Sequence, residues 1–107
     1  MDSRRPLPFS PLYHPSVAIP VELPGAGLVT KGLADLGAEI ESIEALLVSI
    51  GASRLTELGL DVPRPRPSPE HRLYELLRVN DPDGAHSRYN ALVRRLVSFE
   101  RALECET

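Results

Sequence analysis

Three histidines are the side chains best suited to metal chemistry, and their spacing does not build a metal site. His14, His71 and His86 fall in no spacing that would pair them as ligands. A zinc site needs histidine, cysteine or carboxylate ligands at short, regular intervals, as in the His-Glu-x-x-His pattern of zinc proteases. Glu70 and His71 supply only half of that pattern. We therefore expect no metal cofactor.

The segment Asp81-Pro82-Asp83-Gly84 looks like the middle of a calcium-binding loop. Such a loop carries glycine at its sixth position and carboxylates at its first and twelfth positions. With Gly84 in sixth place, the first and twelfth positions are Val79 and Asn90, neither of which is a carboxylate. The segment is instead typical of a turn in which an aspartate side chain caps the helix that follows.

No residue has the surroundings of a catalytic nucleophile. The single cysteine, Cys105, stands between Glu104 and Glu106, whose negative charges disfavour a reactive thiolate. No serine lies in a Gly-x-Ser-x-Gly turn. Gly25 and Gly27 lack the Lys-Ser/Thr pair of a phosphate-binding loop. The sequence therefore predicts no catalytic residue and no cofactor, and we expect that the protein is not an enzyme.

Length and composition favour one small domain of a soluble protein. The chain has 107 residues, of which 42% are hydrophobic and 25% are charged, with a formal net charge of −3. That charge argues against bulk attraction to nucleic acid or an anionic membrane. No apolar run approaches the ~18 residues that span a bilayer. A single thiol suits the reducing cytoplasm, and the excess of arginine over lysine indicates GC-rich coding and a bacterial source.

Proline content divides the chain. Six of the eleven prolines lie in residues 1–25, which we expect to form an extended or disordered arm. The apolar segment 16–23 within it is suited to lying along a groove. Residues 26–60 are expected to form short helices, residues 61–68 a stiff proline-rich connector, and residues 69–107 a helical hairpin. Residues 26–107 would then be one domain.

Cap and breaker residues mark where these helices begin and end. A first helix would end near Gly37, and its two interior glycines would weaken it, although Gly32 on the inner face could instead permit close helix packing. Serine is predicted to cap three helices, at Ser42, Ser53 and Ser68, with Pro69 in the first turn of the third of these. Gly51 and Gly59 are predicted to end helices, Gly51 in the left-handed conformation. Leu60 is then expected to fold back on the preceding turn.

One apolar stripe dominates the end of the chain. Its members are spaced three, four, three and four residues apart and so share one face of a helix: Tyr89, Leu92, Leu96, Phe99 and Leu103. Arg88 and Arg95 lie on a flank of this stripe, where they would orient a partner. The predicted fold is all-α, a small bundle of four to five helices with a C-terminal antiparallel helical hairpin and a proline-rich N-terminal arm.

The stripe must be buried against another apolar surface, and the sequence leaves three possibilities. The surface could be Leu73, Leu76 and Leu77 of the same chain, a second copy in a homodimer, or another protein. Val93 and Val97 would widen the stripe beyond what one neighbour covers. We therefore expect a small, non-enzymatic protein–protein interaction module that can self-associate, with the five stripe residues as its core and interaction anchors.

The alternative is a small DNA-binding regulator. Residues 51–56, Gly-Ala-Ser-Arg-Leu-Thr, resemble the turn and early recognition helix of a helix-turn-helix, and Arg54 would contact DNA. The resemblance covers about fifteen residues. Leu47, Glu57 and Gly59 depart from the pattern, and nearby glutamates place negative charge beside the proposed groove. Nucleic acid is therefore a possible partner that the sequence does not favour.

Overall fold

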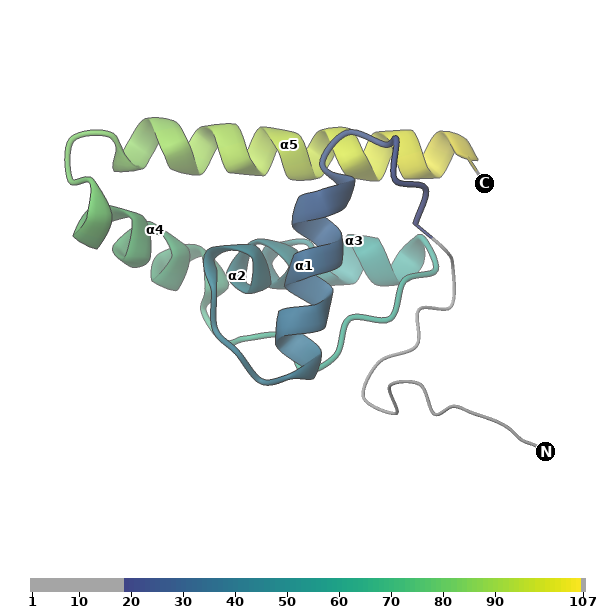
Figure 1. Cartoon of the computed structure of the whole chain (residues 1–107), viewed down its shortest axis with the longest axis horizontal. Coiled ribbons are helices and arrows are strands. Elements are labelled where there is room, and N and C mark those ends of the chain that lie inside the picture. The colour runs from purple at the N-terminus through teal and green to yellow at the C-terminus, as the bar shows by residue number, and fades with distance from the viewer. Residues whose placement is uncertain (1–18, 107) are drawn as a thin grey trace.

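The computed structural model describes residues 19–106 and confirms the all-α bundle. This part of the chain forms five helices and no strand (Figure 1). The helices run in the order α1 (Ala26–Gly37), α2 (Ile43–Ile50), α3 (Ala52–Glu57), α4 (Pro69–Asn80) and α5 (Ala85–Glu106). The predictions for residues 1–18, which are an extended or disordered arm and no metal ligand at His14, concern a part of the chain outside the described residues.

Helix α2 is the centre of the bundle. It contacts α1, α4 and α5 and is joined to α3 by the single residue Gly51. Residues 45–49 are all buried, which is the pattern of a helix enclosed on every side rather than of one with a single inner face. Ser49 is the polar member of this set, and its hydroxyl donates to the backbone oxygen of Ala45 at 2.8 Å. Burial of α2 therefore leaves no polar side chain unsatisfied at Ser49.

Glycine sets how closely the helices approach one another. A Cβ on Gly32 of α1 would lie 2.8 Å from Val48 Cγ1 and 2.9 Å from the backbone carbon of Glu44, so only glycine fits where α1 crosses α2. This confirms the predicted close packing at Gly32. At Gly51, a Cβ would come within 3.0 Å of Leu96 Cδ2, which brings the α2–α3 corner against α5.

The predicted helix ends are partly correct. Ser42 caps α2, because its hydroxyl accepts the amide of Ala45 at 3.1 Å. Gly59 adopts the left-handed conformation (φ 100°), and the Leu60 amide donates back to the Leu55 carbonyl at 3.0 Å, as expected. Leu60 is buried there.

Three of the predicted end signals are wrong in whole or in part. Gly51 does end α2 as predicted, but its φ is −92°, so its backbone is not left-handed, and its small size matters because it lies close to Leu96. Ser53 lies inside α3, because that helix begins directly after Gly51. Ser68 does occupy the N-cap position of α4, but its backbone is left-handed (φ 46°) and its side chain makes no capping hydrogen bond. Pro69 does begin α4, as predicted.

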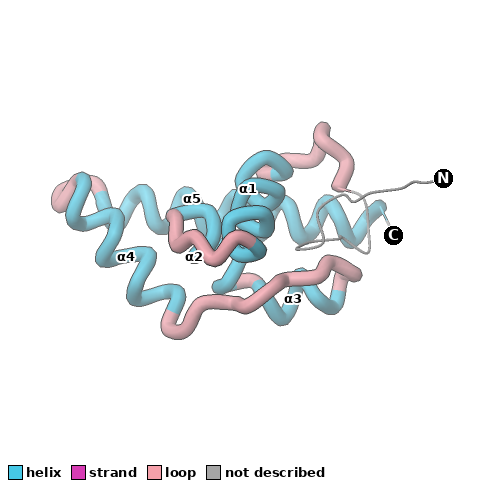
Figure 2. The backbone as a smooth tube through the Cα atoms, turned by 60° about the horizontal axis from the view of Figure 1, so that its bottom comes forward, coloured by secondary structure: helices cyan, strands magenta, loops and turns pink. Residues whose placement is uncertain are grey.

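The last two helices form the predicted hairpin, and they diverge from the turn that joins them (Figure 1). In that turn, Asp81 Oδ1 accepts the amide of Gly84 at 3.1 Å, which is the capping role expected in place of a calcium loop. Helix α4 then packs on α2 as well as on α5. The connector between α3 and α4 runs along the outside of the molecule without helical structure (Figure 2).

Residues 19–25, which the proline pattern assigns to the arm, lie against the helices. Leu23 is 9% exposed and Ile19 packs on the core, whereas Val21 between them is 90% exposed. The Leu23 amide donates to the Pro20 carbonyl at 3.2 Å and forms a turn that leads into α1. Within the described residues, the folded part of the chain therefore begins at residue 19 and not at residue 26.

Candidate interaction surface

The five stripe residues on α5 fall into two groups. Leu96, Phe99 and Leu103 are 3%, 0% and 1% exposed, and they belong to the core of the chain itself. Tyr89 and Leu92 are half-buried and pack only against its margin. The C-terminal half of the stripe is therefore covered by the chain's own helices, while its N-terminal half retains exposed apolar surface.

Tyr89 meets the neighbouring helix through an aromatic pair. Its ring lies 6.0 Å from that of Tyr74 on α4, at an interplanar angle of 75°, which is an edge-to-face contact. Partial burial raises the pKa of Tyr89, and the negative charge of Glu70 adds to that shift. The pair joins α4 to α5 close to their turn and leaves both tyrosines partly accessible.

The two arginines predicted to orient a partner lie on the solvent-facing flank of α5. Arg88 and Arg95 are exposed, and neither forms an ion pair with any residue in the range 19–106. The backbone of Arg95 faces Gly25, where an added Cβ would stand 3.0 Å from its carbonyl oxygen. The structure therefore leaves the two guanidinium groups accessible, and their role in orienting a partner stays a prediction.

Arg54, the predicted DNA contact, is directed toward carboxylates of its own chain. Its guanidinium lies 2.9 Å from Glu104 and 3.3 Å from Glu57. Glu100 lies close by, and its burial raises the pKa of that carboxyl, against the opposing charge of Arg54. The hydrogen bond and charge of Glu104 raise the pKa of Arg54. The α2–α3 corner therefore presents an arginine neutralised by glutamates, beside a six-residue helix.

A groove lies between α2 and α4 and reaches Val79 near the hairpin turn. It has a volume of about 270 Å³. Leu46, Leu76 and Val79 supply its apolar lining, and its polar rim consists of Glu41, His71, Arg72 and Glu75. Leu46 is fully buried and Leu76 half-buried, but Val79 is 79% exposed. A valine that exposed on a rigid helix is the kind of apolar group that a partner would cover.

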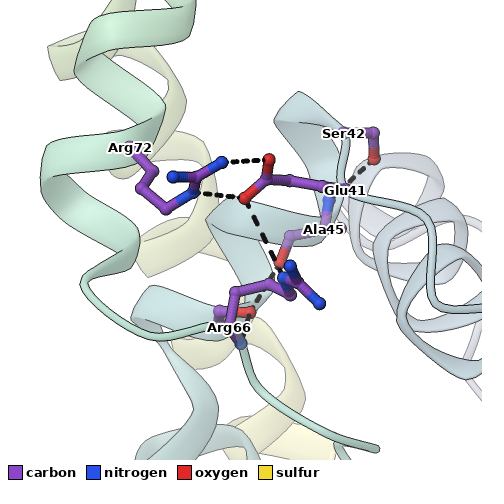
Figure 3. Close-up of polar contacts among 6 residues, drawn as sticks. Glu41, Ser42, Ala45, Arg66 and Arg72 are labelled. Carbon is purple, nitrogen blue, oxygen red and sulfur yellow. Dashed lines mark hydrogen bonds and ion pairs between the residues drawn. The ribbon is translucent and has the colours of Figure 1, made fainter.

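A polar network holds one wall of this groove in place (Figure 3). Glu41 accepts two hydrogen bonds from the guanidinium of Arg72, which joins the segment before α2 to α4. The bonds from Arg72 lower the pKa of Glu41. The backbone amide of Arg66 donates to Ser49 Oγ at 2.9 Å and so attaches the connector to α2. The rim is therefore fixed by paired charges and does not depend on packing alone.

The sequence pattern missed Val79 as a surface residue. The residues of α4 predicted to cover the stripe were Leu73, Leu76 and Leu77, of which Leu73 and Leu77 are buried. On a helical projection, Leu76 and Val79 extend the apolar arc of α4 well to one side of the buried pair. An apolar arc wider than one neighbour covers is the signal that could have identified this groove.

The candidate chemical groups are dispersed, and the comparisons add no family. Among residues 19–106, no three histidine, cysteine, aspartate or glutamate side chains gather as metal ligands, and Cys105 is exposed as a free thiol. In the same range, no helix combines the length and hydropathy needed to cross a membrane. His86 contacts Asn90 at 3.2 Å, and His71 lies on the groove rim. Comparison with protein-family models, curated proteins and solved structures finds no match to the chain.

Proposed function

We propose that this protein is a small, non-enzymatic protein–protein interaction module that acts in the cytoplasm of a bacterium. The observation that carries the proposal is the apolar groove between α2 and α4, with Val79 exposed beside it on a helix whose opposite face is buried. Interfaces bury a small apolar centre and keep a polar rim. Leu46, Leu76 and Val79 supply such a centre here.

The rim suits recognition of a protein rather than of nucleic acid. Its charged groups alternate in sign, with Arg72 paired to Glu41 and Arg78 paired to Glu75 at 3.2 Å. A surface that binds duplex DNA needs a row of basic groups to meet phosphates. The pairing of Arg54 with Glu57 and Glu104 weighs against the helix-turn-helix alternative, because carboxylates of the same chain already occupy its guanidinium. We therefore favour the protein–protein interaction module over the DNA-binding regulator.

Under this proposal, the five stripe residues predicted as anchors have two different roles. Leu96, Phe99 and Leu103 stabilise the fold, because they are already enclosed by the chain. Tyr89 and Leu92 remain partly accessible near the same end of the molecule as the groove. Arg88 and Arg95 would set the orientation of a partner from the flank of α5.

Site-specific photo-cross-linking in the source cells tests the proposal. A photoreactive amino acid at position 79 should give covalent adducts with a protein chain, because that side chain would be enclosed in the interface. The same amino acid at position 97 on α5, where valine is 36% exposed, is the matched control. Adducts absent at position 79, or equally strong at position 97, would contradict the proposal.

A further inference from the structure

We infer that the occupant of the α4 groove is a second copy of this chain, bound through an antiparallel pairing of the two α4 helices. The inference rests on the proposed function and names the partner. One antiparallel register of two α4 helices does two things at once. It pairs opposite charges across the contact, and it places the exposed valine of each copy over the apolar groove of the other.

The outward face of α4 carries charges in alternating order along the helix. Arg72, Glu75 and Arg78 follow one another at intervals of three residues and are all exposed. When a second α4 runs antiparallel, Glu75 stands opposite the partner's Arg78, and the partner's Glu75 stands opposite Arg78. A two-fold axis generates both contacts from one, as an isologous interface requires. Within one copy Glu75 and Arg78 are already paired at 3.2 Å, so the two-fold contact would join four charges of alternating sign.

The same register places Val79 over the partner's groove. If Glu75 is opposite the partner's Arg78, then Val79 falls between the partner's Arg72 and the partner's Leu76. Arg72 and Leu76 are neighbours that line the groove in each copy. The most exposed valine of the hairpin would thus enter an apolar hollow, and the two-fold axis would fill both grooves. Charge pairing and apolar burial agree on one arrangement, which favours a second copy over an unrelated helix.

Parallel pairing would not produce this match. It would set Glu75 beside the partner's Glu75 and Arg78 beside the partner's Arg78, and like charges in contact oppose association. The inference therefore commits to the antiparallel form alone.

The test is a charge-exchange experiment followed by sedimentation equilibrium, with a reductant present because Cys105 is an exposed thiol. The wild type should approach twice the 11.8 kDa mass of one chain as its concentration rises. E75R and R78E should each weaken self-association by roughly tenfold or more, since each brings like charges together. An equimolar mixture of the two variants should restore the dimer, because every facing pair is then opposite in sign.

A second variant keeps the test independent of that charge pair. Val79→Glu should remain folded, as judged by circular dichroism, and should be monomeric, because it would bury a carboxylate in an apolar groove. Val97→Glu is the control and should dimerise like the wild type. Monomeric wild-type protein at about millimolar concentration would overturn the inference, as would a dimer that E75R, R78E and Val79→Glu leave unchanged.

The outcomes separate this inference from the proposed function. If position 79 cross-links to a different protein while the purified chain stays monomeric, the second copy is excluded and the interaction module stands. If position 79 cross-links only to residues 1–18 of the same chain, both are overturned. If the mixture of E75R and R78E forms no dimer although each variant is folded, the antiparallel register is wrong.

Discussion

The two halves of α5 carry one continuous apolar pattern and have opposite surroundings. In the C-terminal half, Leu96, Phe99 and Leu103 are buried, with Gly25 before α1, helix α2 and the α2–α3 corner packed against this part of α5. In the N-terminal half, Tyr89 and Leu92 have α4 as their neighbour across the hairpin and remain half-exposed. Spacing alone therefore shows that a helix face is apolar, but it does not tell a core face from a docking face.

The difference arises from glycine and not from the stripe itself. A Cβ on Gly25 would stand 3.4 Å from Phe99 Cβ, and one on Gly51 would stand 3.0 Å from Leu96 Cδ2. These two residues let backbone approach the C-terminal half of α5 closely enough to exclude water. Gly27, Gly32 and Gly84 show no such contact with Tyr89 or Leu92. The N-terminal half of α5, next to the hairpin turn, is therefore the part of this helix that keeps accessible apolar surface for a partner.

The largest expected effect is at the centre of the enclosed half. Phe99→Ala should lower the free energy of unfolding by about 3–5 kcal/mol, because a fully buried ring is replaced by a cavity. Leu92→Ala should cost only roughly 1 kcal/mol, since much of that side chain already meets water. Urea denaturation followed by circular dichroism measures both. Equal losses at the two positions would remove the distinction between the halves.

The next effect tests the glycine explanation at the α1–α2 crossing. Gly32→Ala should destabilise the fold by about 1–3 kcal/mol, because its Cβ would collide with Val48 and with the backbone of Glu44. Gly27→Ala on the same helix is the control, since nothing lies within 4 Å of an added Cβ there. That control should be neutral or stabilising by up to about 1 kcal/mol. Thermal unfolding measures the stability of both variants. If Gly32→Ala were as stable as the wild type, the close contact between α1 and α2 would be refuted.

Two glutamates should give pH dependences of opposite sign. The pKa of Glu41 is lowered by its bonds from Arg72, so its contribution to stability is present above its ordinary pKa of 4.5 and is lost as pH falls below it. The pKa of Glu100 is raised by burial beside Leu96, so its ionised form costs stability above the folded pKa, and that cost disappears as pH falls. Glu41→Gln should therefore destabilise the protein near neutral pH, whereas Glu100→Gln should stabilise it. Denaturation at several pH values checks both signs, and the same sign for both would contradict this account.

The smallest effect is expected at the ion pairs of α3. Arg54→Ala should change stability only slightly, because its bonds to Glu57 and Glu104 are exposed to water. The same variant tests the DNA-binding alternative through duplex binding measured at two salt concentrations. Salt-sensitive binding by the wild type that Arg54→Ala abolishes would favour the regulator over the interaction module.

Local signals in the sequence predicted the helices well, while contacts between distant segments were not predictable. Ser42, Gly59 and Pro69 act within a few residues of themselves, so their effect on the backbone can be inferred without knowing the fold. The true role of Gly51 depends on Leu96, forty-five positions later, and no local pattern contains that contact. The groove likewise depends on α4 lying against α2, although the wide apolar arc of Leu76 and Val79 was visible in the sequence.

The rate of thiol labelling at single cysteines tests the central distinction most directly. In a Cys105→Ser background, Leu96→Cys and Val79→Cys place one thiol in the enclosed half of α5 and one on the groove edge of α4. In dilute, folded protein, the thiol at position 79 should react at least about 100-fold faster than the thiol at position 96, which opens only by unfolding. Raising the protein concentration should slow labelling at position 79 alone, as the second copy covers it. Comparable rates at the two positions, or a slow rate at position 79 in dilute solution, would contradict the account.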